Sequence, residues 1–231
     1  IQYGPSVAER FPQQSAKVSD YIAQAYFLRA LIHLDLCLVY GQTYTFTDDA
    51  SHLGTAVMTS IPDIKGKIAR SSAATTYRQV LQDLETALSM FSSSYGGSCF
   101  YASPAACKAL MARVYLYMGN YGEAIRKSSD VISDYGLSLT PRQGYVAMFC
   151  SRKEGSEAIF RLNGLSSGTN LRSMFDYTSQ KMYPSNKLTE LFARENASWP
   201  GSDIRSELLS YTTPDGTYYS GVCMKFIDTE D

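Results

Sequence analysis

The sequence predicts a mainly α-helical protein with long irregular loops and a few short strands. Three observations support this fold class. Through much of residues 17–135, apolar residues recur every three or four positions, which is the spacing of one face of a helix. Glycine, serine and proline mark the ends of these stretches. Beyond residue 140 the regular spacing stops, and the sequence becomes rich in turn-forming residues and aromatics.

The first helix is expected over residues 17–40, with Gly41 as its C-terminal stop. Its apolar residues repeat at helical spacing, so we expect them to form one buried stripe. The stripe consists of Val18, Ile22, Ala25, Leu28, Ile32, Leu36 and Val39. A loop over residues 42–70 follows this helix. The second helix is expected over residues 74–91, with Ser71 or Ser72 as its cap.

A helical hairpin is predicted over residues 105–135. Ser103 and Pro104 form a helix start, and residues 105–118 are apolar nearly all round. A turn at Gly119 leads to a partner helix over 121–135. Small residues and a turn glycine at this spacing are typical of tetratricopeptide-like hairpins. The pattern consists of Ala112, Tyr115, Gly119, Tyr121 and Ala124.

The helices at 17–40 and 74–91 resemble a second hairpin of the same kind, split by the 42–70 loop. Residues 14–135 are therefore predicted to form a tetratricopeptide-like helical core. The remainder, residues 136–231, is predicted to be rich in loops.

Within residues 136–231 we expect four features. Residues 156–162 form a short buried extended segment, 164–181 a long irregular loop, 185–194 a short helix, and 218–224 strand-like structure. Long irregular loops in compact domains are commonly functional, and the aromatic residues here favour that interpretation. Trp199 is expected to pack against residues 203–205 rather than to serve as a stacking platform for ligand.

Composition excludes several classes of function. The chain has 231 residues, with 21 Lys and Arg against 22 Asp and Glu, so nucleic acid is not expected as a ligand. No apolar run approaches the roughly 20 residues of a membrane helix, because Arg29, His33 and Asp35 interrupt the longest one. The five cysteines include no Cys-x-x-Cys pair, so no metal or cofactor is predicted. Cys37 and Cys107 are expected on apolar helix faces.

No catalytic site is predicted. The chain has two histidines, His33 and His52, and its neighbouring carboxylates, such as Asp48 and Asp49, are expected to be solvated. Neither a phosphate-binding glycine loop nor a G-x-S-x-G or H-E-x-x-H motif is present. The sequence therefore predicts a binding protein rather than an enzyme.

Six segments occur in the order found in one known family. They are residues 25–30 running into 39–41, Arg70-Ser71 followed by 77–88, the 106–124 hairpin, Glu157-Ala158-Ile159-Phe160, Asp203-Ile204-Arg205, and Tyr219 with Lys225-Phe226. Together they resemble the SusD/RagB-type outer-membrane nutrient-binding lipoproteins, over about residues 17–226. Family members begin with a lipidated cysteine and continue past the last segment, so we expect a chain trimmed at both ends.

This resemblance implies a single binding domain over residues 1–231. The 14–135 core would support a ligand-binding face over 136–231 that is incomplete at its C-terminus. The implied function is capture of oligosaccharides at the surface of the outer membrane and their delivery to a SusC-like TonB-dependent transporter. Contact with the membrane would occur only through an N-terminal lipid anchor that is absent from this chain.

Two loops contain the candidate ligand-binding residues. Aromatic rings stack on the apolar faces of sugars, and polar side chains hydrogen-bond their hydroxyls. Both the composition and the resemblance point to the loop after Gly41 and to the loop after the 157–160 segment. The candidates are Tyr44, Phe46, Asp48, Asn170, Arg172, Phe175, Tyr177 and Tyr183. The alternative for each ring is packing that anchors its loop.

Two other functions remain open at this point. The chain could capture peptides, as the protein-degrading branch of the family does. It could also be a tetratricopeptide-type adaptor that binds protein partners along its helices and has no small ligand.

Overall fold

A computed structural model describes most of the chain, namely residues 1–63, 66–92, 95–96, 98–150, 157–162, 174–175, 182–199 and 203–224. The chain divides into two compact units. Residues 1–137 and 159–161 form the N-terminal unit, and residues 138–158 and 162–231 form the C-terminal unit. The single domain expected from the sequence stays a prediction.

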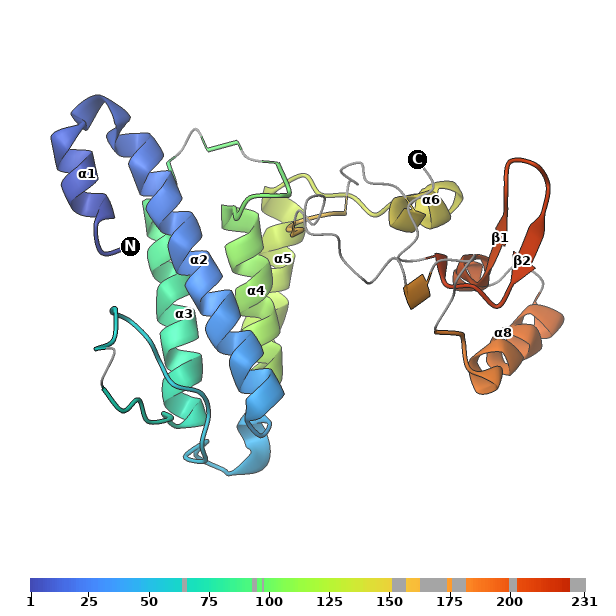
Figure 1. Cartoon of the computed structure of the whole chain (residues 1–231), viewed down its shortest axis with the longest axis horizontal. Helices are drawn as coiled ribbons and strands as arrows, with labels where there is room; N and C mark the ends of the chain where they lie inside the picture. Colours follow the sequence, from blue (N-terminus) through green and yellow to red (C-terminus); the bar gives the residue numbers. More distant parts are fainter. Residues whose placement is uncertain are drawn as a thin grey trace. The chain divides into compact units, whose positions relative to one another are not determined.

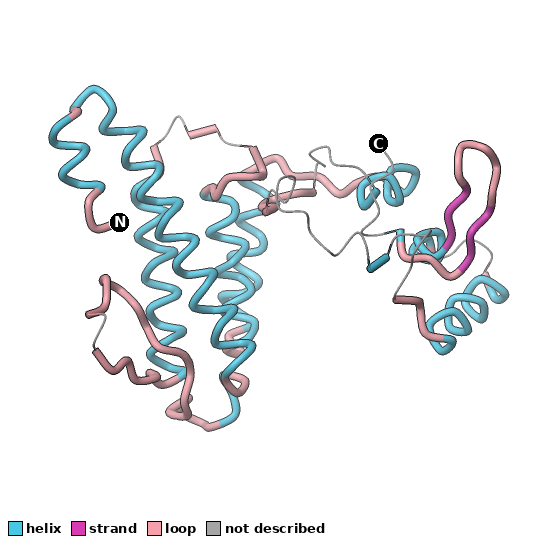
Figure 2. The backbone as a smooth tube through the Cα atoms, viewed as in Figure 1, coloured by secondary structure: helices cyan, strands magenta, loops and turns pink. Residues whose placement is uncertain are grey.

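The N-terminal unit is a bundle of helices that lie side by side (Figures 1 and 2). In it α2 packs against α3, α3 against α4, and α4 against α5. The helices are α1 (Gly4–Arg10), α2 (Ser15–Tyr40), α3 (Ala73–Met90), α4 (Pro104–Tyr117) and α5 (Tyr121–Asp134). The predicted mainly α fold with two helical hairpins is confirmed.

The helix ends follow the predicted signals. The side chains of Ser72, Ser103 and Asn120 each accept a hydrogen bond from an amide in the first turn of α3, α4 and α5, respectively. Gly119 turns the chain between α4 and α5 with a φ of +75°, a conformation that glycine adopts without steric cost.

Most of the predicted buried stripe of α2 is not buried, although Ile22 is 7% exposed. Ile32 is 56% exposed and Val39 is 71% exposed, and Leu28 and Leu36 are also exposed. The opposite face is the buried one, and it contains Ala23, Phe27, Ala30, Leu34 and Cys37. Both faces carry apolar residues at helical spacing, so periodicity alone did not distinguish the inner face from the outer one.

By length and composition, the stretch Pro12–Tyr40 is long and apolar enough to cross a membrane, in contrast to the expectation from its charged residues. Its inner face packs on α3, and Arg29 on α2 forms an ion pair with the buried Asp83 of α3, at 2.6 Å between Nη2 and Oδ1. These contacts are those of a core helix in a bundle.

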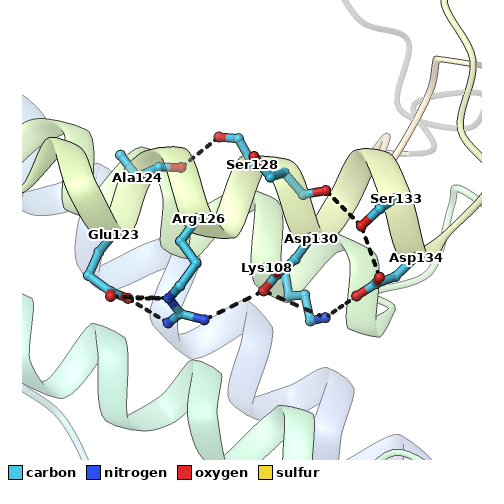
Figure 3. Close-up of polar contacts among 9 residues, drawn as sticks. Lys108, Glu123, Ala124, Arg126, Ser128, Asp130, Ser133 and Asp134 are labelled. Atoms are coloured by element: carbon cyan, nitrogen blue, oxygen red, sulfur yellow. Dashed lines mark hydrogen bonds and ion pairs between the residues drawn. The ribbon is translucent and has the colours of Figure 1, made fainter.

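Polar contacts also join α4 to α5 along their outer surfaces (Figure 3). Lys108 Nζ of α4 lies 2.9 Å from Asp134 Oδ2 of α5, and Arg126 pairs with Glu123 one turn away. These pairs are partly exposed to solvent, so each contributes little to stability. The hairpin is held mainly by apolar burial, including Cys107, whose pKa burial raises to about 12. Cys37 is buried as well, so both thiols lie where the sequence predicted them.

The C-terminal unit has its own small core of Leu208, Val222 and Met224. Its helices are α6 (Tyr145–Cys150) and α8 (Asn186–Ser198), and strands β1 (Ser210–Thr212) and β2 (Tyr218–Ser220) pair antiparallel. The side chain of Ser185 caps α8, close to the predicted start.

Two local predictions were wrong. The described part of the 156–162 segment contains no strand. Instead, Phe160 packs edge-on against Phe27 with ring centroids 4.9 Å apart, and the Arg161 amide donates to the Cys99 carbonyl at 2.7 Å. Trp199, which we expected to pack, is 75% exposed at the end of α8.

Candidate functional site

The 42–55 segment, which contains three of the predicted ligand-binding residues, follows α2 and forms the first part of the connection to α3. α2 ends at Tyr40, and the Gly41 amide donates to the Cys37 carbonyl at 2.8 Å. A Cβ added at Gly41 would lie 2.6 Å from that carbonyl oxygen, so the close turn requires glycine. A single 3₁₀ turn, Tyr44–Phe46, follows.

Hydrogen bonds attach this segment to the N-terminus of α3. The amides of Ala73 and Ala74 donate to the carbonyls of His52 and Ala50 at 2.8 and 2.9 Å. The first amides of a helix have no partner within the helix, so the segment satisfies two donors that α3 leaves open. The backbone of the 42–55 segment is therefore ordered by contacts that do not involve ligand.

Ala50 marks the sharpest bend in the segment. It is buried and has a φ of +52°, in the left-handed region that disfavours residues with a Cβ. Such strain persists only where the surrounding structure holds it. Here the Ala50 amide donates to the Thr47 carbonyl at 3.0 Å, and the Ala50 carbonyl accepts from α3.

Tyr44 and Phe46 face different environments. Tyr44 is half-buried, packs against the core of the bundle, and has its ring centroid 4.7 Å from that of Tyr77. The hydroxyl of Tyr77 is itself desolvated, and burial raises its pKa to about 12. This packing fits the alternative in which the Tyr44 ring anchors its loop.

Phe46, in contrast, is 61% exposed. Its ring packs against His52 in a T-shaped arrangement, with centroids 5.4 Å apart, and His52 Nδ1 is hydrogen-bonded to Thr47 Oγ1 at 2.9 Å. The exposed carboxylates of Asp48 and Asp49 follow along the chain. Asp49 accepts hydrogen bonds from Ser51, and these bonds lower the pKa of its carboxyl group.

The second predicted loop is only partly described. Asn170, Arg172 and Tyr177 lie outside the described residues. Phe175 is half-buried and packs against the core of the C-terminal unit. Tyr183 is 69% exposed and precedes the cap of α8.

Three features of these surfaces were not predicted from the sequence. Tyr40, the last residue of α2, is 69% exposed, and Leu53 at the other end of the 42–55 segment is 57% exposed. The guanidinium of Arg70 binds the carbonyls of both residues. The exposure of Tyr40 could have been inferred from its position directly before the helix stop Gly41. The Arg70 contacts could not be inferred, because they depend on the three-dimensional arrangement.

Other candidate sites are less developed. A hollow of about 530 Å³ in the N-terminal unit is lined by residues that include Tyr3, Arg29, Met58 and Ile61, and by none of the predicted ligand-binding residues. Within the described ranges, no cluster of three or more His, Cys, Asp or Glu residues could hold a metal ion.

Comparison with known proteins finds one matching family model and several similar solved structures. Residues 6–116 match the family model SusD-like_3, described as "Starch-binding associating with outer membrane". A SusD superfamily protein from Bacteroides thetaiotaomicron matches 87% of the chain with 25% identity and a TM-score of 0.70. Over residues 6–116 the chain is similar to the SusD-like family, and its fold is that of SusD superfamily structures.

Other solved structures share this SusD-like fold. A putative sugar-binding protein from Bacteroides vulgatus matches 94% of the chain with 20% identity and a TM-score of 0.75. A SusD-like carbohydrate-binding protein from the same organism matches 94% with 20% identity and a TM-score of 0.70. The chain spans 44%, 48% and 46% of these three structures, about half of their length. No curated protein sequence matches it.

Proposed function

We propose that this chain captures oligosaccharides at the cell surface by aromatic stacking and polar contacts and delivers them to a SusC-like TonB-dependent transporter. It makes and breaks no covalent bonds in the sugar. The description of the matching family as starch-binding, and the sugar-binding descriptions of two structural relatives, support a carbohydrate ligand.

The observation that carries this proposal is the placement of Phe46. Its ring is 61% exposed although the backbone around it is held by α3 and by the Tyr44 anchor. A ring that is already fixed in place loses little conformational freedom when a ligand binds, which favours affinity. The ring face can stack on the C–H groups of a sugar.

The neighbouring Asp48 supplies the polar contact. Its carboxylate is exposed two residues after Phe46, and hydroxyl donors form short, strong hydrogen bonds to carboxylates. An apolar ring beside a few polar groups is the usual composition of a small-molecule site. Tyr183, Phe175, Asn170, Arg172 and Tyr177 are proposed as further contacts in the C-terminal unit.

The proposed location follows from the family description, which associates these proteins with the outer membrane. In this proposal the protein is attached by a lipid anchor and faces the outside of the cell. The helical bundle acts as a frame, and the loops receive the ligand.

An oligosaccharide array followed by calorimetry tests the proposal. We expect the folded protein to bind at least one oligosaccharide, with maltoheptaose as the first probe, and to leave it uncleaved. Phe46→Ala should weaken binding about tenfold, the size of a loss of about 1.4 kcal/mol. Tyr121→Ala is a matched control, because Tyr121 is an exposed ring (65%) on α5, outside both candidate loops.

Other outcomes would contradict the proposal. Folded protein that binds no oligosaccharide but binds a peptide library would support the peptide-capture alternative. If Phe46→Ala and Tyr121→Ala lose equal oligosaccharide affinity, the ligand-binding site is not on the 42–55 segment.

A further inference from the structure

Arg70 joins the two ends of the 42–55 segment. Its Nη2 donates to the carbonyl oxygens of Tyr40 at 2.9 Å and Leu53 at 3.1 Å, and its Nε donates to the carbonyl oxygen of Gly54 at 2.7 Å. One guanidinium therefore binds the last residue of α2 and the residues at which the segment returns to α3.

Each of these acceptors suits a cation. The Tyr40 carbonyl is among the last carbonyls of α2, which lack partners within the helix. The C-terminal end of a helix carries partial negative charge, so a guanidinium is favoured there. Arginine presents several donors in a rigid planar group and can bind three carbonyls at once, which a lysine ammonium on a flexible stem does less well.

The return end of the segment is fixed independently of Arg70. The Gly54 amide donates to the Ser71 carbonyl at 2.8 Å, and a Cβ at Gly54 would lie 2.6 Å from Thr76 Oγ1 and 2.9 Å from the Cα of Ala73. This end therefore lies directly against α3. What Arg70 adds is the connection from this fixed point back to the end of α2.

The residues between these two ends include Tyr44, Phe46 and Asp48. With both ends joined, the intervening chain is a closed loop, and closing a loop restricts the conformations of all residues within it. Without Arg70, the start of the segment would keep the Gly41 turn, the packing of Tyr44 and the contacts of Phe46 and Thr47 with His52, but it would lose its direct connection to the return end.

We propose that Arg70 is a positioning residue for ligand binding: it closes the 42–55 segment and thereby fixes the Phe46 ring in its ligand-binding position. This inference rests on the proposed function, in which the segment binds oligosaccharide. Arg70 itself touches no ligand in this account.

Amide hydrogen exchange without ligand tests the closure directly. Arg70→Met keeps the apolar stem and removes the donors, and should speed exchange at the amides of Phe46 and Ala50, which donate to Thr43 and Thr47 within the segment. Arg78→Met is the matched control, because Arg78 is an exposed arginine on α3 that contacts Thr75 Oγ1 at 3.1 Å. It should leave these amides unchanged. Equal exchange in Arg70→Met and wild type would overturn the proposal.

A double-mutant cycle tests positioning, with maltoheptaose as the first probe and the best ligand of the oligosaccharide array as the second. Alone, Arg70→Met should raise Kd about tenfold. In a Phe46→Ala background it should raise Kd less than about twofold, because the ring that Arg70 positions is gone. Additive effects would mean that Arg70 acts through general stability, which contradicts the proposal.

Two further results keep the test decisive. Where Arg70→Met does not fold, Arg70→Lys retains the charge, and should show intermediate exchange and affinity. Where wild type binds no oligosaccharide but Arg70→Met still speeds exchange, the closure stands while the proposed function and the positioning role that rests on it fail.

Discussion

Replacing Arg29 by methionine should strongly destabilise the N-terminal unit. Arg29 on α2 binds Asp83 on α3 through two hydrogen bonds, Nε to Oδ2 at 2.7 Å and Nη2 to Oδ1 at 2.6 Å. Asp83 is 1% exposed and also accepts from Gln79 Nε2 at 2.8 Å. Arg29→Met would leave a buried carboxylate with only the Gln79 contact.

The expected cost is about 3–5 kcal/mol, the range found when one partner of a buried ion pair is removed. The remaining Gln79 bond and the partial exposure of Arg29 favour the lower end, about 3 kcal/mol. For a chain of this length, each kcal/mol corresponds to roughly 2–4 °C in Tm, so Tm should fall by roughly 6–12 °C. Urea unfolding followed by circular dichroism measures the free energy directly.

A double variant separates the buried charge from general packing. In Arg29→Met with Asp83→Leu, no uncompensated carboxylate remains, and apolar replacement of a buried pair is often neutral or stabilising. We expect the double variant to recover most of the stability lost in Arg29→Met. A loss below about 1 kcal/mol in the single variant, or no recovery in the double variant, would refute the role assigned to this pair.

Three further predictions concern the segment between α2 and α3 and the α2 residue His33, which contacts it. Tyr44→Ala should lower the free energy of unfolding by about 2–3 kcal/mol, because its half-buried ring packs on Tyr77. Phe46→Ala should change the free energy of unfolding by less than about 1 kcal/mol, because its ring is exposed. Urea unfolding of the two variants compares these losses. Ala50→Val should cost more than about 2 kcal/mol by the same measurement, since a β-branched residue is disfavoured at a φ of +52° in a buried site. Burial lowers the pKa of His33, whose Nε2 accepts from the Met58 amide at 3.0 Å, so the unfolded chain takes up this proton first as pH falls. Stability should therefore decline as pH falls below the ordinary value of 6.5, and the His33→Gln variant should show a smaller decline over about pH 5–8 in urea midpoints.

The helices of the N-terminal unit could be predicted because their signals are local. Ser72 and Ser103 cap α3 and α4, and Gly119 turns the chain with a positive φ. Each signal depends only on residues within one or two turns. Tertiary packing then extended or shortened each helix by a residue or two.

The buried face of α2 could not be predicted in the same way. Leu28, Ile32 and Val39 have the spacing of a core stripe, as do Phe27 and Leu34, and only the position of α3 decides between the two faces. The segment 156–162 is predicted from the sequence to be buried and extended, but in the structure Phe160 packs on Phe27 without forming a strand.

In the candidate site, too, the sequence could not predict which side chains are buried and which are exposed. Tyr44 and Phe46 are two residues apart and equally aromatic, yet one packs inward and the other is exposed. Their difference depends on the 3₁₀ turn and on the contacts of the segment with α3. Arg70 was recognised in the sequence as part of a motif, but its three carbonyl partners lie 16 to 30 positions away.

The most direct test of the account is the NMR response of the Phe46 ring to oligosaccharide in protein with labelled phenylalanine. We predict that the Phe46 ring signals shift during the titration and that sugar ring protons shift through the ring current, while the buried Phe27, 2% exposed, does not respond. Oligosaccharide binding that leaves the Phe46 signals unchanged would contradict the account.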